Sequence, residues 1–365
     1  MALSIGIVGL PNVGKSTLFN ALNGGGAEAA NYPFCTIDPN IGLVPVPDSR
    51  IDALIKIVNP QAVQRAVVEF VDIAGLVAGA ASGEGLGNKF LGNIRECSAI
   101  AHVVRCFDDS NVTHVHDKVD PVSDIETIDT ELMLKDMESL QKAMERQQKL
   151  TRSGGNKDAE NALAAMQAVL TQLEDGTTVR RQQHVASIIE VIEPINLLTA
   201  KPVLYVANVD DGSLPDGNAY VEQVREYAKG EGAEVAVVSA QIESELIEMD
   251  EEDKAEFLSD LGLTEPGLNT VIRTAFKLLN LATYFTAGVK EVRAWTIHVG
   301  DTAPKAAGVI HTDFEHGFIR AETIAYEDFV SLGGEAKCKE AGKMRLEGKE
   351  YIVKDGDILH FRFNV

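Results

Sequence analysis

Short apolar runs alternate with longer segments of helical periodicity along most of the chain. Strands that are apolar on both faces and alternate with helices are typical of a mostly parallel sheet covered by helices on both sides. Five runs have this character, at residues 5–8, 67–73, 99–107, 202–209 and 234–239. A further run, Ile41–Pro45, ends in proline, which favours an edge strand beside 67–73. We therefore expect an α/β fold.

A long polar insertion separates the third and fourth of these runs. It holds two sets of apolar residues spaced three or four apart, each marking a narrow seam on an otherwise charged helix. The sets are Met133, Met137, Leu140 and Met144, and then Leu163, Met166, Leu170 and Leu173. A turn sequence at 153–156 lies between them, which predicts a projecting antiparallel helical hairpin. Two ordinary surface helices are the alternative.

Near Leu281 the pattern changes to alternation and short strands. Residues 292–297 alternate between apolar and polar positions, and another short strand is expected at 361–363. This mixture predicts a small α+β domain.

Charge and cysteine content narrow the function classes. The 365 residues include 33 Lys and Arg against 55 Asp and Glu, a net charge of −22. This charge argues against a protein whose whole surface binds nucleic acid non-specifically, but it leaves room for one local contact patch. Residues 281–365 carry 11 basic and 13 acidic residues, so this part repels an anionic partner least. Four scattered cysteines without a C-x-x-C pair, and no signal-like or membrane-spanning run, fit a cytoplasmic protein with no membrane contact.

The strongest chemical signal is G-L-P-N-V-G-K-S at 9–16, between the predicted strand 5–8 and a helical stretch. In a G-x-x-x-x-G-K-S loop, backbone N–H groups and the helix N-terminus hold phosphates, and the lysine bridges the β- and γ-phosphates. The Ser16 hydroxyl would ligate Mg²⁺. The expected phosphate contacts are Asn12, Val13, Gly14, Lys15, Ser16 and Thr17. A glycine-rich structural turn is the alternative.

Two further segments predict a nucleotide switch. In D-I-A-G at 72–75, Asp72 would hold Mg²⁺ and the Gly75 N–H would contact the γ-phosphate. Thr36 lies where a switch threonine completes the Mg²⁺ coordination once γ-phosphate is present. Many P-loop GTPases place a water-orienting glutamine directly after D-x-x-G, and Leu76 cannot take that role. Either hydrolysis is slow or another group positions the water.

The base-reading segment departs from the guanine pattern N-K-x-D. The chain has N-V-D-D at 208–211, so Asn208 and Asp211 remain while Val209 replaces the lysine. The companion loop S-A-Q at 239–241 supplies Ser239 and Ala240 but departs from the usual S-A-K. Adenine lacks the paired donors that would reward the Asp211 carboxylate, which favours guanine. The departures at Val209 and in the S-A-Q loop argue against strict guanine specificity.

Together these motifs resemble the translation-factor class of P-loop GTPases. The segment E-F-V-D-I-A-G-L-V at 69–77, continuing as G-E-G-L-G-N-K-F at 83–90, is similar to the glycine-rich switch of the Obg family. N-Y-P-F-C-T at 31–36, the altered base-reading segment and F-R-F-N-V at 361–365 narrow the resemblance to the YchF or Obg-like ATPases. The resemblance extends over essentially the whole chain.

The resemblance implies three parts: an OBG-type nucleotide-binding domain at 1–125 and 198–280, an inserted hairpin at 126–197, and a β-grasp-like TGS domain at 281–365. It implies an ATPase that uses GTP less well, and a ribosome contact through the hairpin and TGS domain. Asn208 and Val209 would line the base pocket, and Asp211 stands where the subfamily commonly has glutamate. A histidine in the loop after strand 99–107, here His114, would orient the attacking water.

Asn12 indicates a second cofactor, because P-loop proteins with asparagine here coordinate K⁺ beside the phosphates. Two other functions stay open at this point. One is a GTP-specific GTPase of ribosome assembly, and the other is a binding module whose nucleotide is structural and seldom hydrolysed. The sequence does not set the oligomeric state, for which a monomer is our working expectation, nor the redox behaviour of Cys35 beside Thr36.

Overall fold

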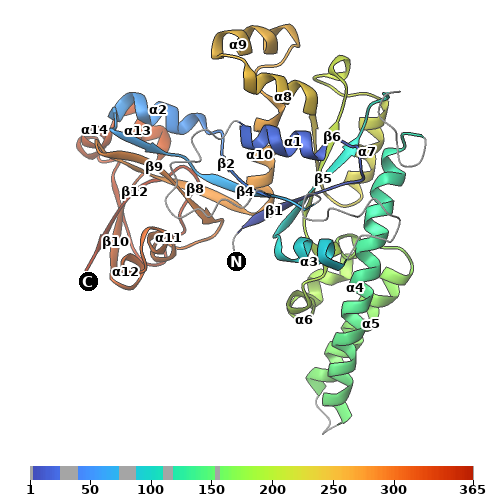
Figure 1. Ribbon diagram of the computed structural model, residues 1–365. Helices are drawn as coiled ribbons and strands as arrows, with labels where there is room; N and C mark the ends of the chain where they lie inside the picture. Colours follow the sequence, from blue (N-terminus) through green and yellow to red (C-terminus); the bar gives the residue numbers. More distant parts are fainter. Residues whose placement is uncertain (1–2, 25–39, 74–87, 110–117, 153–156, 365) are drawn as a thin grey trace. The chain divides into compact units, whose positions relative to one another are not determined.

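The computed structural model describes residues 3–24, 40–73, 88–109, 118–152 and 157–364 (Figure 1). The chain forms two compact units. Unit 1 comprises Met1–Leu43 and Glu69–Ala275, and unit 2 comprises Val44–Val68 and Phe276–Val365. Each unit is described separately below.

Unit 1 is built on a six-stranded sheet in the order β2-β4-β1-β5-β6-β7. The strands are β1 (Ser4–Val8), β2 (Ile41–Pro45), β4 (Val67–Asp72), β5 (Ala99–Arg105), β6 (Val203–Asn208) and β7 (Glu234–Val238). Pairing is parallel from β4 through to β7. Every residue of β1, β5 and β6 is buried, as strands covered on both faces require. The parallel sheet and its edge strand β2 are therefore confirmed.

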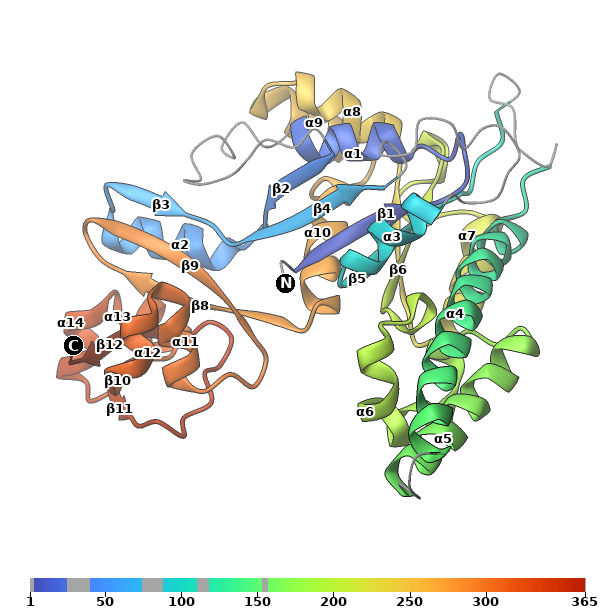
Figure 2. The same cartoon turned by 60° about the horizontal axis from the view of Figure 1, so that its bottom comes forward.

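Helices cover the faces of this sheet. They are α1 (Lys15–Gly24), α3 (Asn88–Glu96), α7 (Ala219–Lys229), α8 (Ala240–Glu248) and α10 (Gly267–Leu278), whereas α9 (Glu251–Asp260) packs on α8 (Figure 1). Figure 2 shows α1 on one side of the sheet, packed beside α8, and α3 on the other. Since α1 starts directly after β1 and its loop, the sheet fixes where the helix N-terminus lies.

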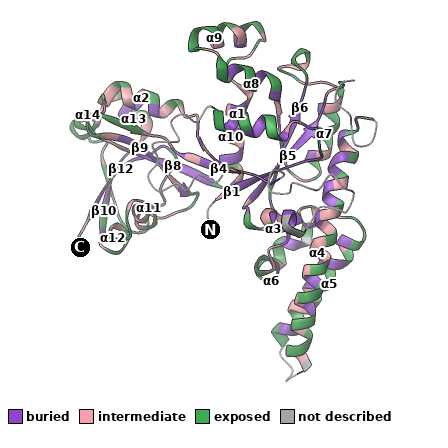
Figure 3. Ribbon diagram, viewed as in Figure 1, coloured by how far each residue is buried: buried purple, intermediate pink, exposed green. Residues whose placement is uncertain are grey.

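The insertion forms the expected helical pair. Helices α4 (Pro121–Arg152) and α5 (Lys157–Glu174) lie side by side, and their far ends extend away from the sheet of unit 1 (Figure 1). All eight seam residues predicted from the spacing belong to one apolar cluster, and Figure 3 shows its buried positions along the facing sides. Helix α6 (Ile189–Ile192) and short 3₁₀ turns at 179–188 and 193–200 complete this layer. The expected turn at 153–156 lies outside the described residues.

Unit 2 has its own six-stranded sheet in the order β11-β10-β12-β8-β9-β3. The strands are β3 (Ala62–Gln64), β8 (Leu281–Ala287), β9 (Glu291–His298), β10 (Phe318–Ile324), β11 (Arg345–Glu347) and β12 (Ile358–Phe363). Its helices are α2 (Ser49–Val58), α11 (Ala303–Ile310), α12 (Thr312–His316), α13 (Tyr326–Leu332) and α14 (Glu335–Glu340). Parallel and antiparallel pairs both occur, which confirms the expected mixed α+β architecture.

Segment 44–68 supplies two elements of unit 2. Strand β3 pairs in parallel with β9, opposing Val63 to Val292. Arg50, in α2, binds Asp48 and reaches Asp355, with closest N–O distances of 2.8 and 2.6 Å. Nothing in the hydrophobic pattern had indicated this association. Within the described part of the chain, no helix is both long and apolar enough to span a bilayer.

Candidate functional site

The loop between β1 and α1 has the backbone that its glycines predict. Gly9 and Gly14 have φ angles of 149° and 95°, which glycine alone adopts readily. Asn12 has a φ of 61°, in the left-handed region where asparagine is one of the few residues tolerated. A Cβ atom on Gly9 would collide with the carbonyl oxygen of Val103 in β5. The loop therefore needs glycine both for its turn and for its close approach to the sheet.

Asn208, the last residue of β6, is hydrogen-bonded to this loop. Its side-chain amide donates to the carbonyl oxygen of Val13 at 2.9 Å, and its Oδ1 accepts from the Ala240 N–H at 2.9 Å. The side chain is buried, and a Cβ atom on Gly14 would collide with it. One asparagine thus joins the P-loop to the 239–240 loop, a role that sequence reasoning had not assigned to it.

Lys15, the first residue of α1, points inward. Its side chain is 8% exposed, and Nζ donates to the carbonyl oxygen of Leu10 at 2.5 Å. Burial lowers the pKa of Lys15 to about 8, although the negative charge of Asp72 opposes that change. The ammonium group is therefore held over the loop. The Leu10 carbonyl was not foreseen, because backbone acceptors leave no signature in the sequence.

Oxygen ligands flank this lysine. Ser16 and Thr17 are exposed in the first turn of α1, and Asp72 is buried at the end of β4, opposite Ile7 of β1. Hydroxyl and carboxylate oxygens are the hard ligands that Mg²⁺ prefers, so Ser16 and Asp72 fit that ion. Among the described residues there is no cluster of three or more His, Cys, Asp and Glu side chains that would hold a metal by itself. An Mg²⁺ site here would share its ligands with the nucleotide phosphates.

The base-reading segments meet beside the loop. Val209 is 3% exposed, and its N–H donates to the Val238 carbonyl oxygen at 2.8 Å. The Asp211 carboxylate is exposed and accepts from the Ser239 hydroxyl at 3.0 Å. Ser239 also caps α8, with Oγ 3.4 Å from the Ile242 N–H. The fold thus brings together the two motifs that the sequence had paired.

Several predicted site residues cannot be placed. Thr36, Gly75, His114, Leu76 and Cys35 all lie outside the described residues. The described half of the site therefore comprises the phosphate loop, Asp72 and the base-reading corner.

Two family models match the chain. The model described as "50S ribosome-binding GTPase" matches residues 4–139. The model YchF-GTPase_C, described as a protein of unknown function, matches residues 281–364. The first match includes the P-loop and the D-x-x-G segment, and the second covers most of unit 2 after residue 280.

Full-length relatives are similar throughout. The chain is 60% identical over 365 residues to the "Ribosome-binding ATPase YchF" of Haemophilus influenzae and 55% identical over 367 residues to that of Bacillus subtilis, covering all of each chain. Among solved structures, the "Schizosaccharomyces pombe YchF GTPase" superposes with a TM-score of 0.91 at 39% identity, covering 99% of this chain and 97% of that one.

Proposed function

Because the chain belongs to the YchF family, we propose that it binds and hydrolyses ATP with Mg²⁺ and associates with the ribosome. The observation that carries the nucleotide part is the inward Lys15 over a loop whose glycines hold left-handed backbone angles. The ribosome part rests on the names of full-length relatives, which are called ribosome-binding ATPases. The chain would act in the cytoplasm, and a monomer remains our working expectation.

The phosphate contacts follow from the loop. Backbone N–H groups of 12–17 and the α1 N-terminus would hold the α- and β-phosphates, and Lys15 would exchange the Leu10 carbonyl for phosphate oxygens. Ser16 and Asp72, with Thr36, would hold Mg²⁺, which neutralises phosphate charge when bound. Asn12, at the loop's left-handed position, is the proposed contact to K⁺.

Hydrolysis would proceed by in-line attack of water on the γ-phosphorus, with release of ADP and phosphate. Gly75 would contact the γ-phosphate, and His114 would orient the water in place of the missing glutamine. With Leu76 unable to orient water, turnover would be slow and a partner would accelerate it. A seldom hydrolysed, structural nucleotide is the outcome if purified ribosomes leave phosphate release unchanged.

A GTP-specific protein is the second candidate. The exposed Asp211 carboxylate, hydrogen-bonded to Ser239, retains the guanine-reading acceptor, and the solved yeast relative is titled a GTPase. The buried Val209 favours ATP instead, because a lysine stem would normally pack on guanine at this position. The domain division 1–125 with 198–280, 126–197 and 281–365, with the last as a TGS domain, is part of this proposal.

Isothermal titration with ATP and with GTP, each with Mg²⁺, tests the proposal. We expect tighter binding of ATP. In Asp211→Asn, GTP affinity should fall by about tenfold while ATP affinity stays the same, because only guanine donates to this carboxylate. Tighter binding of GTP than of ATP by the unaltered chain would favour the second candidate. No binding of either nucleotide would contradict both.

A further inference from the structure

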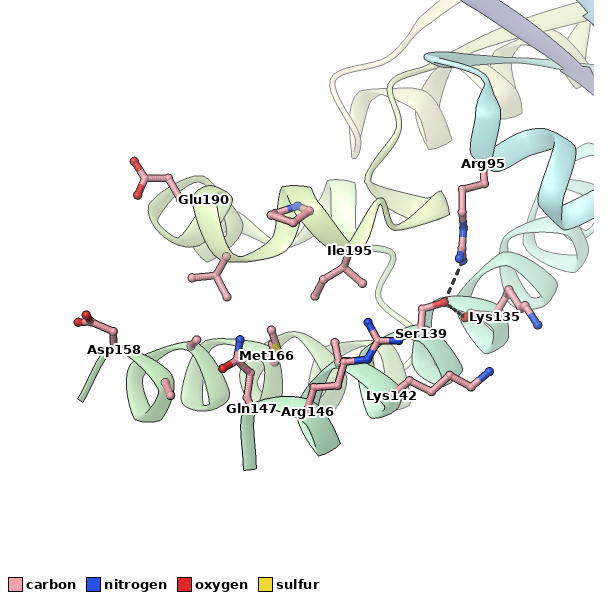
Figure 4. A pocket seen from close by; sticks show the side chains of 15 residues that line it. Arg95, Lys135, Ser139, Lys142, Arg146, Gln147, Asp158, Met166, Glu190 and Ile195 are labelled. Atoms are coloured by element: carbon pink, nitrogen blue, oxygen red, sulfur yellow. Dashed lines mark hydrogen bonds between the residues drawn. The ribbon is translucent and has the colours of Figure 1, made fainter. Parts of the chain in front are cut away.

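A groove of about 670 Å³ lies in unit 1, along the hairpin (Figure 4). Helices α4 and α5 form one wall, and the segment 190–195 around α6 forms the other. Arg95 of α3 reaches in at one end. The volume is in the range of sites that bury a small ligand or a few side chains.

The two ends of the groove carry opposite charge. Lys135, Lys142 and Arg146 share one face of α4, because they recur at seven and then four residues. Figure 4 shows them toward the Arg95 end, whereas Asp158 and Glu190 lie at the opposite end. A concentration of four basic side chains stands out in a chain with a net charge of −22.

Much of the positive charge is available to a partner. Lys142 and Arg146 are exposed and have no ion pair with any residue that the structure describes. Arg95 donates from Nη2 to the Ser139 hydroxyl at 2.9 Å, but its buried Nε has no hydrogen-bond partner among the described residues. Exposed basic groups beside a partly unsatisfied arginine favour a ligand that brings carboxylates or phosphates.

The middle of the groove is apolar, and this favours a peptide with carboxylates over a nucleic acid with phosphates. Ala162 and Met166 of α5 face this space, as do Val191 and Ile195 from the opposite wall. An RNA backbone would gain little from apolar walls, and the carboxylates at the far end would repel its phosphates. A peptide segment would bury apolar side chains there and match both charged ends.

We propose that this groove binds a segment of a ribosomal protein that is apolar in its middle, acidic beside Lys142 and Arg146, and basic beside Glu190. This inference rests on the proposed function, which it deepens by naming the kind of ribosomal partner. Arginine, with tryptophan and tyrosine, is enriched among the residues that contribute most to binding energy in protein interfaces.

Charge reversal on the hairpin tests the basic end. In the full chain, Lys142→Glu with Arg146→Glu should weaken co-sedimentation with purified ribosomes by about tenfold or more. The matched control is Lys149→Glu with Lys157→Glu, which makes the same charge change on the hairpin, at exposed positions of α4 and α5 that do not line the groove. The control should lose less than about threefold. Equal losses in both variants would overturn the inference.

The acidic end and the partner's chemistry are tested separately. Glu190→Gln should weaken ribosome binding if a basic peptide end lies there, whereas tighter binding would indicate phosphates and overturn the proposal. A photo-cross-linking residue placed at Gln147, which lines the groove, should attach to a ribosomal protein segment with adjoining apolar and acidic residues. Attachment to ribosomal RNA would contradict it.

Failure of this inference is distinguishable from failure of the proposed function. If the unaltered chain co-sediments with ribosomes and all groove variants do the same, only the groove assignment falls. If the unaltered chain does not co-sediment under any nucleotide condition, the ribosome association falls and the groove partner with it. Each variant should unfold on heating at the same temperature as the unaltered chain, which would show that the fold is retained.

Discussion

The side-chain amide of Asn208 donates a hydrogen bond to the carbonyl oxygen of Val13, 2.9 Å away and 195 residues earlier in the chain. The same side chain accepts from the Ala240 N–H. A single buried residue at the end of β6 therefore couples the phosphate loop to the base-reading corner. Because the loop already has this shape before nucleotide binds, less free energy is spent on ordering it.

Asn208→Ala should reduce both stability and nucleotide affinity. It leaves a buried carbonyl oxygen and a buried N–H without partners, at a cost of about 3 kcal/mol in the free energy of unfolding. The loop loses its anchor, so ATP affinity should fall by about tenfold or more. Urea unfolding and isothermal titration measure the two effects.

Asn218→Ala is the control for Asn208→Ala. Asn218 donates to the Cys106 carbonyl oxygen at 2.7 Å and caps α7, and none of its hydrogen bonds within the described part of the chain reaches the P-loop. It should lower stability while ATP affinity stays unchanged. An equal loss of affinity in both variants would mean that general destabilisation, not the link to Val13, sets nucleotide binding.

Gly14→Ala should abolish ATP binding. Its φ of 95° is strained for alanine, and the new Cβ would collide with the Asn208 amide. The loop must then shift, and the inward position of Lys15 goes with it. Gly92→Ala in α3 is the comparison, because a Cβ there meets no atom of the described residues within 4 Å. It should bind ATP normally, and unimpaired binding by Gly14→Ala would refute the geometry.

Glu243 in α8 should make stability depend on pH. Burial raises the pKa of Glu243 from 4.5 to about 7, although backbone N–H groups of Gly267 and Leu268 oppose this. Between these two values the folded chain holds a proton that the unfolded chain releases, so this contribution to stability is complete below pH 4.5 and lost as pH rises through 7. Over this pH range the free energy of unfolding falls by at most about 3 kcal/mol.

Glu243→Gln removes this dependence. The amide oxygen keeps the bond from the Leu268 N–H, so the variant should be more stable than the unaltered chain at pH 8 and no more stable at pH 4. Urea unfolding across this range measures the difference. Glu248→Gln, at an exposed position of the same helix, should have no such effect. Identical pH profiles for Glu243→Gln and the unaltered chain would exclude the mechanism.

A buried charged cluster joins the base of the hairpin to the sheet. Arg180 lies 2.6 Å from Asp129 of α4 and 2.9 Å from Glu231 after α7, and the three side chains are 8%, 3% and 0% exposed. Arg181 also pairs with Glu231 at 2.9 Å, and Tyr205 donates to that carboxylate at 2.7 Å. The hairpin is therefore tied to β6 and α7 by charge as well as by apolar contact.

Arg180→Leu should lower the free energy of unfolding by about 3 kcal/mol, because it leaves Asp129 buried with its charge uncompensated. Chemical unfolding measures this. Arg225→Leu breaks an exposed pair with Glu222 on α7 and should cost less than about 1 kcal/mol. If the two substitutions cost the same, the cluster does not anchor the hairpin.

Local patterns predicted much of this structure. The positions of five strands, the edge strand β2 and the eight seam residues of α4 and α5 could all be predicted, because each depends on periodicity within a short stretch. Full burial holds for β1, β5 and β6 but not for β4 or for β7, which lies at the other edge of the sheet. The P-loop was equally clear, since only glycine tolerates the backbone angles at positions 9 and 14. The likeness of 208–211 and 239–241 to the N-K-x-D and S-A-K motifs also predicted that the two segments form one corner.

Other features could be identified only in the folded chain. The link from Asn208 to Val13, the burial of Lys15 over Leu10 and the groove between α5 and residues 190–195 each join positions distant in sequence or involve backbone acceptors. The pairing of β3 with β9, which assigns 44–68 to unit 2, is of the same kind.

By itself, then, the sequence determined the strands, the helical seam and the chemistry available in each motif, because adjacent residues specify backbone angles and which face is apolar. Only the tertiary structure decided that Lys15 donates to the Leu10 carbonyl, that Asn208 supports the phosphate loop and that the basic residues of α4 line a groove. Contacts of this kind depend on how separate elements pack, and no local pattern encodes that.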